Sequence, residues 1–241
     1  GFATKDCFGQ DFYLQTSPEF AMKRLLAAGS GPIYQICKSF RNEDAGRYHN
    51  PEFTMLDWYR SDYDMHALIA EVSGLLQNIL GCGKADKMTY QQAFLTFLGL
   101  DPISASCEEL RECCRNNGHG NIAAQENRKD TLLQLLFSFE IEPHLGDKQP
   151  VAIYHFPATQ SALAKLCPED PEIALRFEFY YKGVELANGF EELQNAAEQL
   201  KRFTIDNQIR RELGRKEKSV DDRFIQALEA GLPQCSGVAL G

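Results

Sequence analysis

The chain has 241 residues, a length that suits one large domain or two small ones. Its 44% of hydrophobic and 24% of charged residues are typical of an ordinary soluble globular protein. The formal net charge of −9 argues against a broad nucleic-acid surface, because binding many phosphates needs a basic face.

The first predicted element is a helix within residues 15–29. Ser17 suits the N-cap, Pro18 suits the first helical position and Gly29 supplies the end. Glu19 then lies in the first turn, where the helix dipole favours a carboxylate, so capping alone explains its presence. The expected buried positions are Phe20, Leu25 and Leu26.

Residues 37–60 predict a hairpin, because side chains in both halves alternate with the period of a strand. Residues 42–51 between them are rich in Asn, Asp, Gly and His and predict a loop. Arg41 and Glu43 then lie at one strand end, and Phe53 lies on the other strand. These types suit a nucleotide, since a guanidinium stabilises phosphate charge, a carboxylate accepts from an adenine amino group and an aromatic ring stacks on the base. A surface hairpin with solvated charges explains the same residue types equally well.

Asp64 caps a predicted helix that runs to Leu80 and ends at Gly81, with an apolar stripe that indicates a core element. Residues 82–150 predict a mostly helical support region. The helices expected there are residues 90–100, one that follows the capping box of Ser106 and Glu109 and ends at 116–118, and residues 131–139.

Two further strands are predicted at residues 151–156 and 173–186, the second broken by a Lys182-Gly183 turn. This turn would pair Tyr180 with Glu185 and make Glu178 and Glu185 diagonal neighbours, roughly 7–8 Å apart at Cα. Two carboxylates on one face attract a divalent cation, and oxygen ligands near a triphosphate favour Mg²⁺. The alternative is a pair of solvated glutamates on an open sheet face.

The segments F-R-N-E (residues 40–43) and R-Y-H-N-P-E-F-T-M-L-D-W-Y (residues 47–59) resemble motif 2 of class II aminoacyl-tRNA synthetases, in the lysyl branch. They resemble still more the short lysyl-tRNA synthetase paralogues that modify elongation factor P. E-L-A-N-G-F-E-E-L (residues 185–193) and Q-S-A-L-A (residues 160–164) extend the resemblance. It implies an α+β fold, with an antiparallel sheet flanked by helices, in one catalytic domain over residues 1–241. Motif 1 and the arginine of motif 3 would then lie outside the given chain.

The resemblance also implies roles for individual residues. Arg41 would be the catalytic residue that holds the α-phosphate, and Glu192 would bind the side-chain ammonium of a lysine-type substrate with help from Asn188. Asp57 stands where the family usually has Glu, which shortens its reach by one methylene. The implied ATP-binding residues are Arg41, Asn42, Glu43, Asn50, Phe53, Glu185, Leu186 and Gly241. The implied substrate-binding residues are Ser17, Glu19, Asp57, Tyr59, Asn188, Glu192 and Ala239, and the implied metal ligands are Glu178 and Glu185.

The reaction implied by the resemblance uses ATP and Mg²⁺ to adenylate lysine or (R)-β-lysine and transfers it to a lysine side chain of elongation factor P. Ala239 stands where lysyl-tRNA synthetases usually have Gly, and its Cβ would favour a β-amino acid. An ordinary lysyl-tRNA synthetase that charges tRNA-Lys is the first alternative, and an inactive paralogue that serves as a binding module is the second. We expect a homodimer that does not use tRNA.

The eight cysteines contain no C-x-x-C pair, and their spacing suggests neither a zinc site nor a disulfide framework. Reduced thiols in a cytoplasmic protein are therefore expected. The sequence contains no signal peptide and no apolar run long enough to span a membrane, so no membrane partner is expected.

Overall fold

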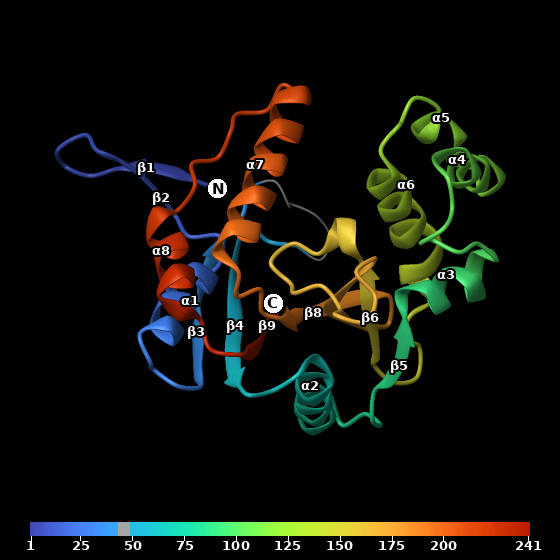
Figure 1. Cartoon of the computed structure of the whole chain (residues 1–241). Helices are drawn as coiled ribbons and strands as arrows, with labels where there is room; N and C mark the ends of the chain where they lie inside the picture. The colour runs from blue at the N-terminus through green and yellow to red at the C-terminus, as the bar shows by residue number, and fades with distance from the viewer. Residues whose placement is uncertain (43–48) are drawn as a thin grey trace. The chain divides into compact units, whose positions relative to one another are not determined.

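The structure is a computed structural model that describes residues 1–42 and 49–241. The chain divides into two compact units, one made of Gly1–Tyr63 with Glu192–Gly241 and the other of Asp64–Glu191. Figure 1 shows their elements coloured along the chain. The expectation of one catalytic domain over residues 1–241 stays a prediction.

The first unit contains three antiparallel strands in the order β3-β4-β9, a separate hairpin of β1 and β2, and helices α1, α7 and α8. Strand β3 pairs with β4 from Ile33 opposite Tyr59 to Phe40 opposite Glu52, which confirms the predicted hairpin around the loop. The bounds of these elements are β1 (Ala3–Lys5), β2 (Asp11–Tyr13), α1 (Glu19–Ala27), β3 (Ile33–Phe40), β4 (Glu52–Ser61), α7 (Ala196–Glu212), α8 (Asp222–Gly231) and β9 (Cys235–Leu240).

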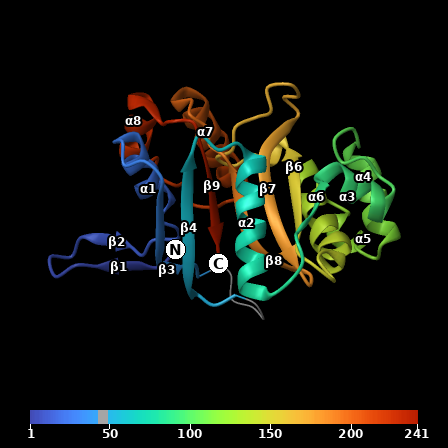
Figure 2. The same ribbon diagram turned by 90° about the horizontal axis from the view of Figure 1, so that it is seen from below.

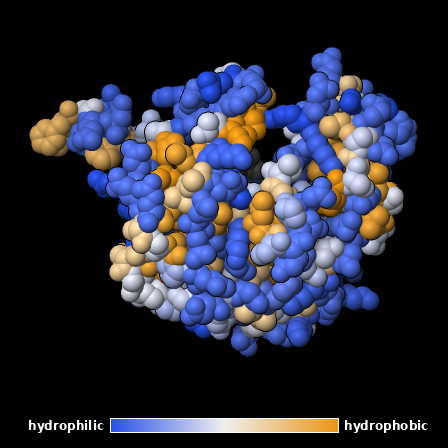
Figure 3. Space-filling view, viewed as in Figure 1, coloured by the Kyte–Doolittle hydropathy of each residue, from blue (hydrophilic) through white to orange (hydrophobic). Residues whose placement is uncertain are grey.

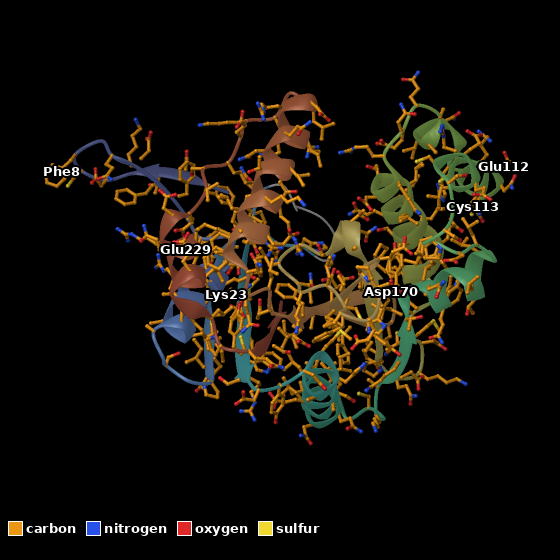
Figure 4. All side chains as sticks on the ribbon, in the orientation of Figure 1. Phe8, Lys23, Glu112, Cys113, Asp170 and Glu229 are labelled. Carbon is orange, nitrogen blue, oxygen red and sulfur yellow. The ribbon has the colours of Figure 1, made fainter. Side chains whose placement is uncertain are left out.

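The core of the first unit forms where α1 and α8 pack side by side (Figure 2). Phe20 stacks on Phe224 with ring centroids 4.3 Å apart. The buried members of this core are Met22, Leu26, Tyr59, Phe224, Leu228, Leu232 and Cys235. The β1–β2 hairpin extends away from α1, and Phe8 at its tip is 92% exposed (Figures 3 and 4).

Helix α1 differs from the prediction in its start and in its buried face. It begins at Glu19, with Pro18 as the N-cap rather than the first helical residue, and Ser17 Oγ accepts from the Glu19 amide at 3.1 Å. Leu25 was predicted to be buried but is 55% exposed. Leu26 is buried as predicted, and it shares the buried face with Met22 and Lys23, because these positions recur at the three- and four-residue spacing of one helix face.

In the second unit the strand order is β8-β7-β6-β5, and α2 packs against β7 and β8. Asp64 caps α2 and Gly81 ends it in the left-handed conformation (φ 62°), both as predicted. The predicted capping box of Ser106 and Glu109 is also present. The bounds here are α2 (Met65–Leu80), β5 (Asp86–Thr89), α3 (Tyr90–Leu98), α4 (Cys107–Asn116), α5 (Gly120–Ala123), α6 (Lys129–Leu136), a π-helix (Phe137–Ile141), 3₁₀ turns at Glu142–His144 and Ala158–Gln160, β6 (Val151–Pro157), β7 (Ile173–Tyr181) and β8 (Val184–Glu191).

Strand β5 was not predicted. It lies inside the region expected to be mostly helical and pairs in parallel with β6, so the strands of this unit are not all antiparallel. Its four residues, D-K-M-T, are too few and too polar to show a strand period.

The β7–β8 hairpin turns at Lys182 and Gly183, whose φ values of 52° and 70° are those of a tight hairpin turn. Tyr180 pairs with Glu185, as predicted. The register then shifts, so that Glu178 lies opposite Asn188. A β-bulge of this kind adds a residue to one strand, which the alternating pattern of the sequence does not reveal.

Candidate functional site

Four predicted substrate-binding residues come together in the first unit, around α1, β4 and the start of the second chain segment. Asp57 and Tyr59 lie on the same face of β4, and they are 2% and 3% exposed. Glu192 is 2% exposed and is held by its backbone amide, which donates to the carbonyl of Cys235 at 3.0 Å. Glu19 reaches the cluster from the first turn of α1. Glu192 is thus removed from bulk solvent, as a role in ammonium binding requires.

Lys23 of α1, which is labelled in Figure 4, contacts two of these acids. Its Nζ is 2.7 Å from Oε1 of Glu19 and 2.5 Å from Oε2 of Glu192. The side chain is 2% exposed, and its ammonium also lies 5.8 Å from the ring centroid of Phe224. The sequence analysis did not identify Lys23, although a Glu four residues before a Lys on a helix is a recognisable pairing signal.

Burial changes the protonation of these groups. Desolvation raises the pKa of Glu192 to about 8, and the charges of Glu19 and Asp57 add to this while Lys23 opposes it. Desolvation, with the charge of Glu19, likewise raises the pKa of Asp57 to about 7. The pKa of Lys23 is raised because the two glutamates outweigh its own burial. The cluster therefore retains protons near pH 7.

Strand β9 lines the same cluster. Its register places Gly237 opposite Tyr59 and Ala239 opposite Asp57. A Cβ on Gly237 would lie 2.6 Å from Oε1 of Glu192 and closer still to the Tyr59 ring. Gly237 therefore allows the close approach of these side chains, a role that the sequence analysis missed.

The predicted nucleotide residues Arg41, Asn42, Asn50 and Phe53 lie at the loop end of the β3–β4 hairpin, and Gly241 follows β9. The guanidinium of Arg41 lies 5.5 Å from the ring centroid of Phe53, and its Nε donates to the carbonyl of Thr16 at 3.3 Å. The remaining members Asn42, Asn50 and Gly241 are exposed, and Glu43 lies outside the described residues. The hairpin thus brings together the arginine and the aromatic ring that were predicted to hold phosphate and adenine.

The predicted metal ligands lie in the second unit, on the β7–β8 hairpin. Glu178 is 6% exposed, and its carboxylate accepts from Arg176 at 2.5 Å and from the hydroxyl of Tyr180. Arg176 also donates from Nε to Oδ1 of Asn188 at 3.3 Å. Glu185 is exposed. The sequence analysis missed Arg176 and Tyr180 as partners of Glu178, although the period-2 spacing places all three on one face.

For the remaining predicted site residues, the roles stay predictions. Leu186 follows Glu185 at the bulge of β8 and is half-buried. Asn188 and Glu192 belong to different units, so their joint action on an ammonium group stays a prediction. The same holds for the prediction that Arg41 and the two metal-binding glutamates surround one triphosphate.

Among residues 1–42 and 49–241, no three His, Cys, Asp or Glu side chains gather closely enough to hold a metal ion alone. This fits Mg²⁺, which is usually bound by one or two carboxylates plus substrate phosphates. Burial and the charge of Glu178 together raise the pKa of Glu142 to about 6. The carboxylates of Glu142 and Glu178 therefore repel one another.

A model of the family described as tRNA synthetases class II (D, K and N) matches residues 2–241. The chain belongs to this family. The predicted α+β class II synthetase fold is thereby confirmed, and membership of this ligase family implies the use of ATP.

Three similar relatives are all elongation factor P–(R)-β-lysine ligases. The protein from Edwardsiella ictaluri is 57% identical over 97% of this chain and 72% of its own length. Those from Proteus mirabilis and Vibrio cholerae are each 58% identical over the same shares. The predicted resemblance to the paralogues that modify elongation factor P is confirmed. Among the described residues, no helix is both long and apolar enough to cross a bilayer.

Proposed function

We propose that this member of the class II synthetase family adenylates (R)-β-lysine with ATP and transfers it to a lysine side chain of elongation factor P. The observation that carries the proposal is the cluster of the buried Asp57 and Glu192 with the half-buried Glu19 around a single ammonium group. Three carboxylates and one cation leave two negative charges when all are ionised. A lysine-type amino acid supplies two ammonium groups, one for each.

The chemistry proceeds in two steps. A carboxylate oxygen of the amino acid attacks the α-phosphorus of ATP, and the bond to pyrophosphate breaks. An acceptor amine then attacks the acyl carbon, and AMP leaves with the bonding electrons. Arg41 stabilises the charge on the phosphoryl oxygens, and Phe53 stacks on the adenine. The residues position reactants and stabilise charge, and no covalent bond to the protein is needed.

Glu178 and Glu185 are the residues that would hold Mg²⁺, which supplies charge neutralisation to the triphosphate when bound. Carboxylate oxygens are the donors that Mg²⁺ prefers. Arg176 and Tyr180 orient the Glu178 carboxylate by direct hydrogen bonds. The carboxylate orientation is thus fixed before the nucleotide arrives, as positioning catalysis requires.

The first experiment is ATP–pyrophosphate exchange with (R)-β-lysine, α-lysine and norleucine, the last of which lacks the side-chain ammonium. We expect exchange with the first two and none with norleucine. Transfer to elongation factor P and to tRNA-Lys is then measured with the activated amino acid. Transfer to tRNA-Lys alone would identify a lysyl-tRNA synthetase, and no exchange with any amino acid would identify an inactive paralogue; either result would overturn the proposal.

The proposal includes assembly as a homodimer in the cytoplasm, as the family resemblance implies. Light scattering of the purified protein measures the assembly directly, and a monomer at micromolar concentration would contradict this part. The acceptor assay is independent of that result.

A further inference from the structure

Lys23 is a buried cation that no step of the adenylation chemistry uses. It sits in the middle of α1, on the inner face with Met22 and Leu26. A lysine is rarely buried to this extent unless a carboxylate accompanies it. Here two carboxylates accompany Lys23. Glu19 lies one helical turn away on α1, and Glu192, far from it in the sequence, begins the unit's second segment.

The bridge uses one oxygen of each glutamate. Lys23 Nζ contacts Oε1 of Glu19 and Oε2 of Glu192. The other oxygen of Glu192, Oε1, is buried and has no hydrogen-bond partner within the described part of the chain. It lies beside Gly237, whose lack of a Cβ allows Glu192 and the Tyr59 ring to approach the backbone of β9. A buried acceptor without a partner is costly, so this oxygen points to a ligand that donates to it.

The charged groups that act on Glu192 lie on helix α1 and strand β4, and strand β9, which also packs against Glu192, carries the buried thiol of Cys235. Helix α1 supplies Lys23 and Glu19, and strand β4 supplies Asp57 and the hydroxyl of Tyr59. Of these, Lys23 alone carries a positive charge. Without it, burial and two neighbouring carboxylates would all favour the protonated acid, and a protonated Glu192 offers an ammonium group no ion pair.

We propose that Lys23 is a positioning residue for the amino-acid substrate: its ammonium holds one oxygen of Glu19 and one oxygen of Glu192 and opposes the protonation of Glu192, so that each carboxylate offers its second oxygen to one substrate ammonium group. The inference rests on the proposed function, because it takes the substrate to be a lysine-type amino acid. A purely structural role would require only that Lys23 tie α1 to the following segment. The two roles differ in how the site responds to pH.

The test compares Lys23→Met, which keeps the length of the side chain but removes its charge, with Lys23→Arg, which keeps the charge. Lys165→Met is the matched control, because Lys165 pairs with the buried Glu191 at 2.9 Å in the other unit. ATP–pyrophosphate exchange gives the KM for the amino acid and for ATP between pH 6 and 9.

For Lys23→Met we expect the amino-acid KM at pH 7 to rise about tenfold or more and its pH profile to move upward by about one unit, since one pKa unit corresponds to a tenfold change. The KM for ATP is expected to stay within about twofold. Lys23→Arg should keep the wild-type pH profile even if its KM for the amino acid rises. Lys165→Met should change neither the KM for the amino acid nor its pH profile. An unmoved profile in Lys23→Met, or equal shifts in both Lys23 variants, would overturn the inference.

A second measurement does not depend on activity. In the wild type, the contribution of Glu192 to stability declines as pH rises and levels off above its folded pKa of about 8. In Lys23→Met this decline should extend to higher pH, as urea unfolding at a series of pH values would show. The same curve in both proteins would overturn the role of Lys23 even if the enzyme acts on another amino acid. An inactive wild type with the expected shift would instead refute the proposed function alone.

Discussion

Nζ of Lys23 and Oε2 of Glu192 lie 2.5 Å apart in a site where both side chains are at most 2% exposed. Tight ion pairs in such surroundings are strongly coupled to their neighbours, because little solvent screens them. The protonation of Glu192 therefore depends on every charge in the cluster, including that of a bound substrate ammonium group. The following predictions use that coupling.

Replacement of Glu192 by Gln should remove the partner of the side-chain ammonium. Loss of one member of a buried charge pair costs about 2–5 kcal/mol, so the amino-acid KM should rise about thirtyfold or more. The KM for ATP should change little. Glu191→Gln is the control, because Glu191 is also buried but pairs with Lys165 in the other unit. Equal effects of the two substitutions in pyrophosphate exchange would contradict the assignment.

Stability should fall as pH rises from about 5 to about 8. Glu192 and Asp57 have folded pKa values of about 8 and about 7, above their ordinary values of 4.5 and 3.8. The folded state therefore binds more protons than the unfolded state in this window, and stability declines with pH. Urea unfolding gives the free energy of unfolding of the wild type and of Glu192→Gln at each pH, and the difference between them is the contribution of Glu192. A difference that stays flat between pH 6 and 8 would refute the raised pKa.

Binding of the amino acid should release protons near pH 7. The proton retained on Glu192 must leave before that carboxylate can pair with an ammonium group, and the added positive charge also favours loss of the proton that Asp57 retains in part, so about one proton or slightly more is released. Calorimetric titration with (R)-β-lysine in phosphate and in Tris reports the number, because the buffers differ in ionisation enthalpy. Identical binding enthalpies in the two buffers would mean that no proton moves.

The sequence predicted those elements whose signals are local. The Asp64 cap with Gly81, the capping box at Ser106 and the Lys182-Gly183 turn each depend on a few neighbouring residues, and each formed as predicted. These signals act through backbone conformation and short hydrogen bonds, which do not need the rest of the fold.

The sequence did not predict features that depend on distant partners. The inward position of Lys23 is favourable only because Glu192, which is distant in the sequence, lies next to α1 in the fold. The bulge that sets Glu178 opposite Asn188 likewise depends on pairing along the whole of β7 and β8. Leu25 appeared to be a core residue by its type, yet α1 turns its other face inward. Hydrophobicity ranks residues for burial, but the packing partner decides which face is buried.

Replacement of Gly237 by Ala should disturb the cluster. The added Cβ would overlap the Tyr59 ring and lie 2.6 Å from Oε1 of Glu192. Overpacking of this kind costs about 1–3 kcal/mol and should lower the melting temperature while raising the amino-acid KM. Gly74→Ala is the control, since no described atom lies within 4 Å of its added Cβ and Ala favours the interior of α2. A fully stable and active Gly237→Ala protein would mean that the strand shifts freely.

Replacement of Ala239 by Gly should increase the activation of α-lysine. The β9 register sets Ala239 opposite Asp57, at the edge of the acid cluster, where a Cβ restricts the space next to the substrate. Removal of one unfavourable methyl contact is worth about 1–3 kcal/mol, so kcat/KM for α-lysine should rise about fivefold or more. Activation of (R)-β-lysine should not improve, because that substrate places its amino group one carbon further away. Ala152→Gly, at a fully buried position of β6, controls for the general cost of a glycine in a strand. Pyrophosphate exchange with both amino acids gives the ratio, and a ratio equal to that of the wild type would exclude Ala239 as the residue that selects the substrate.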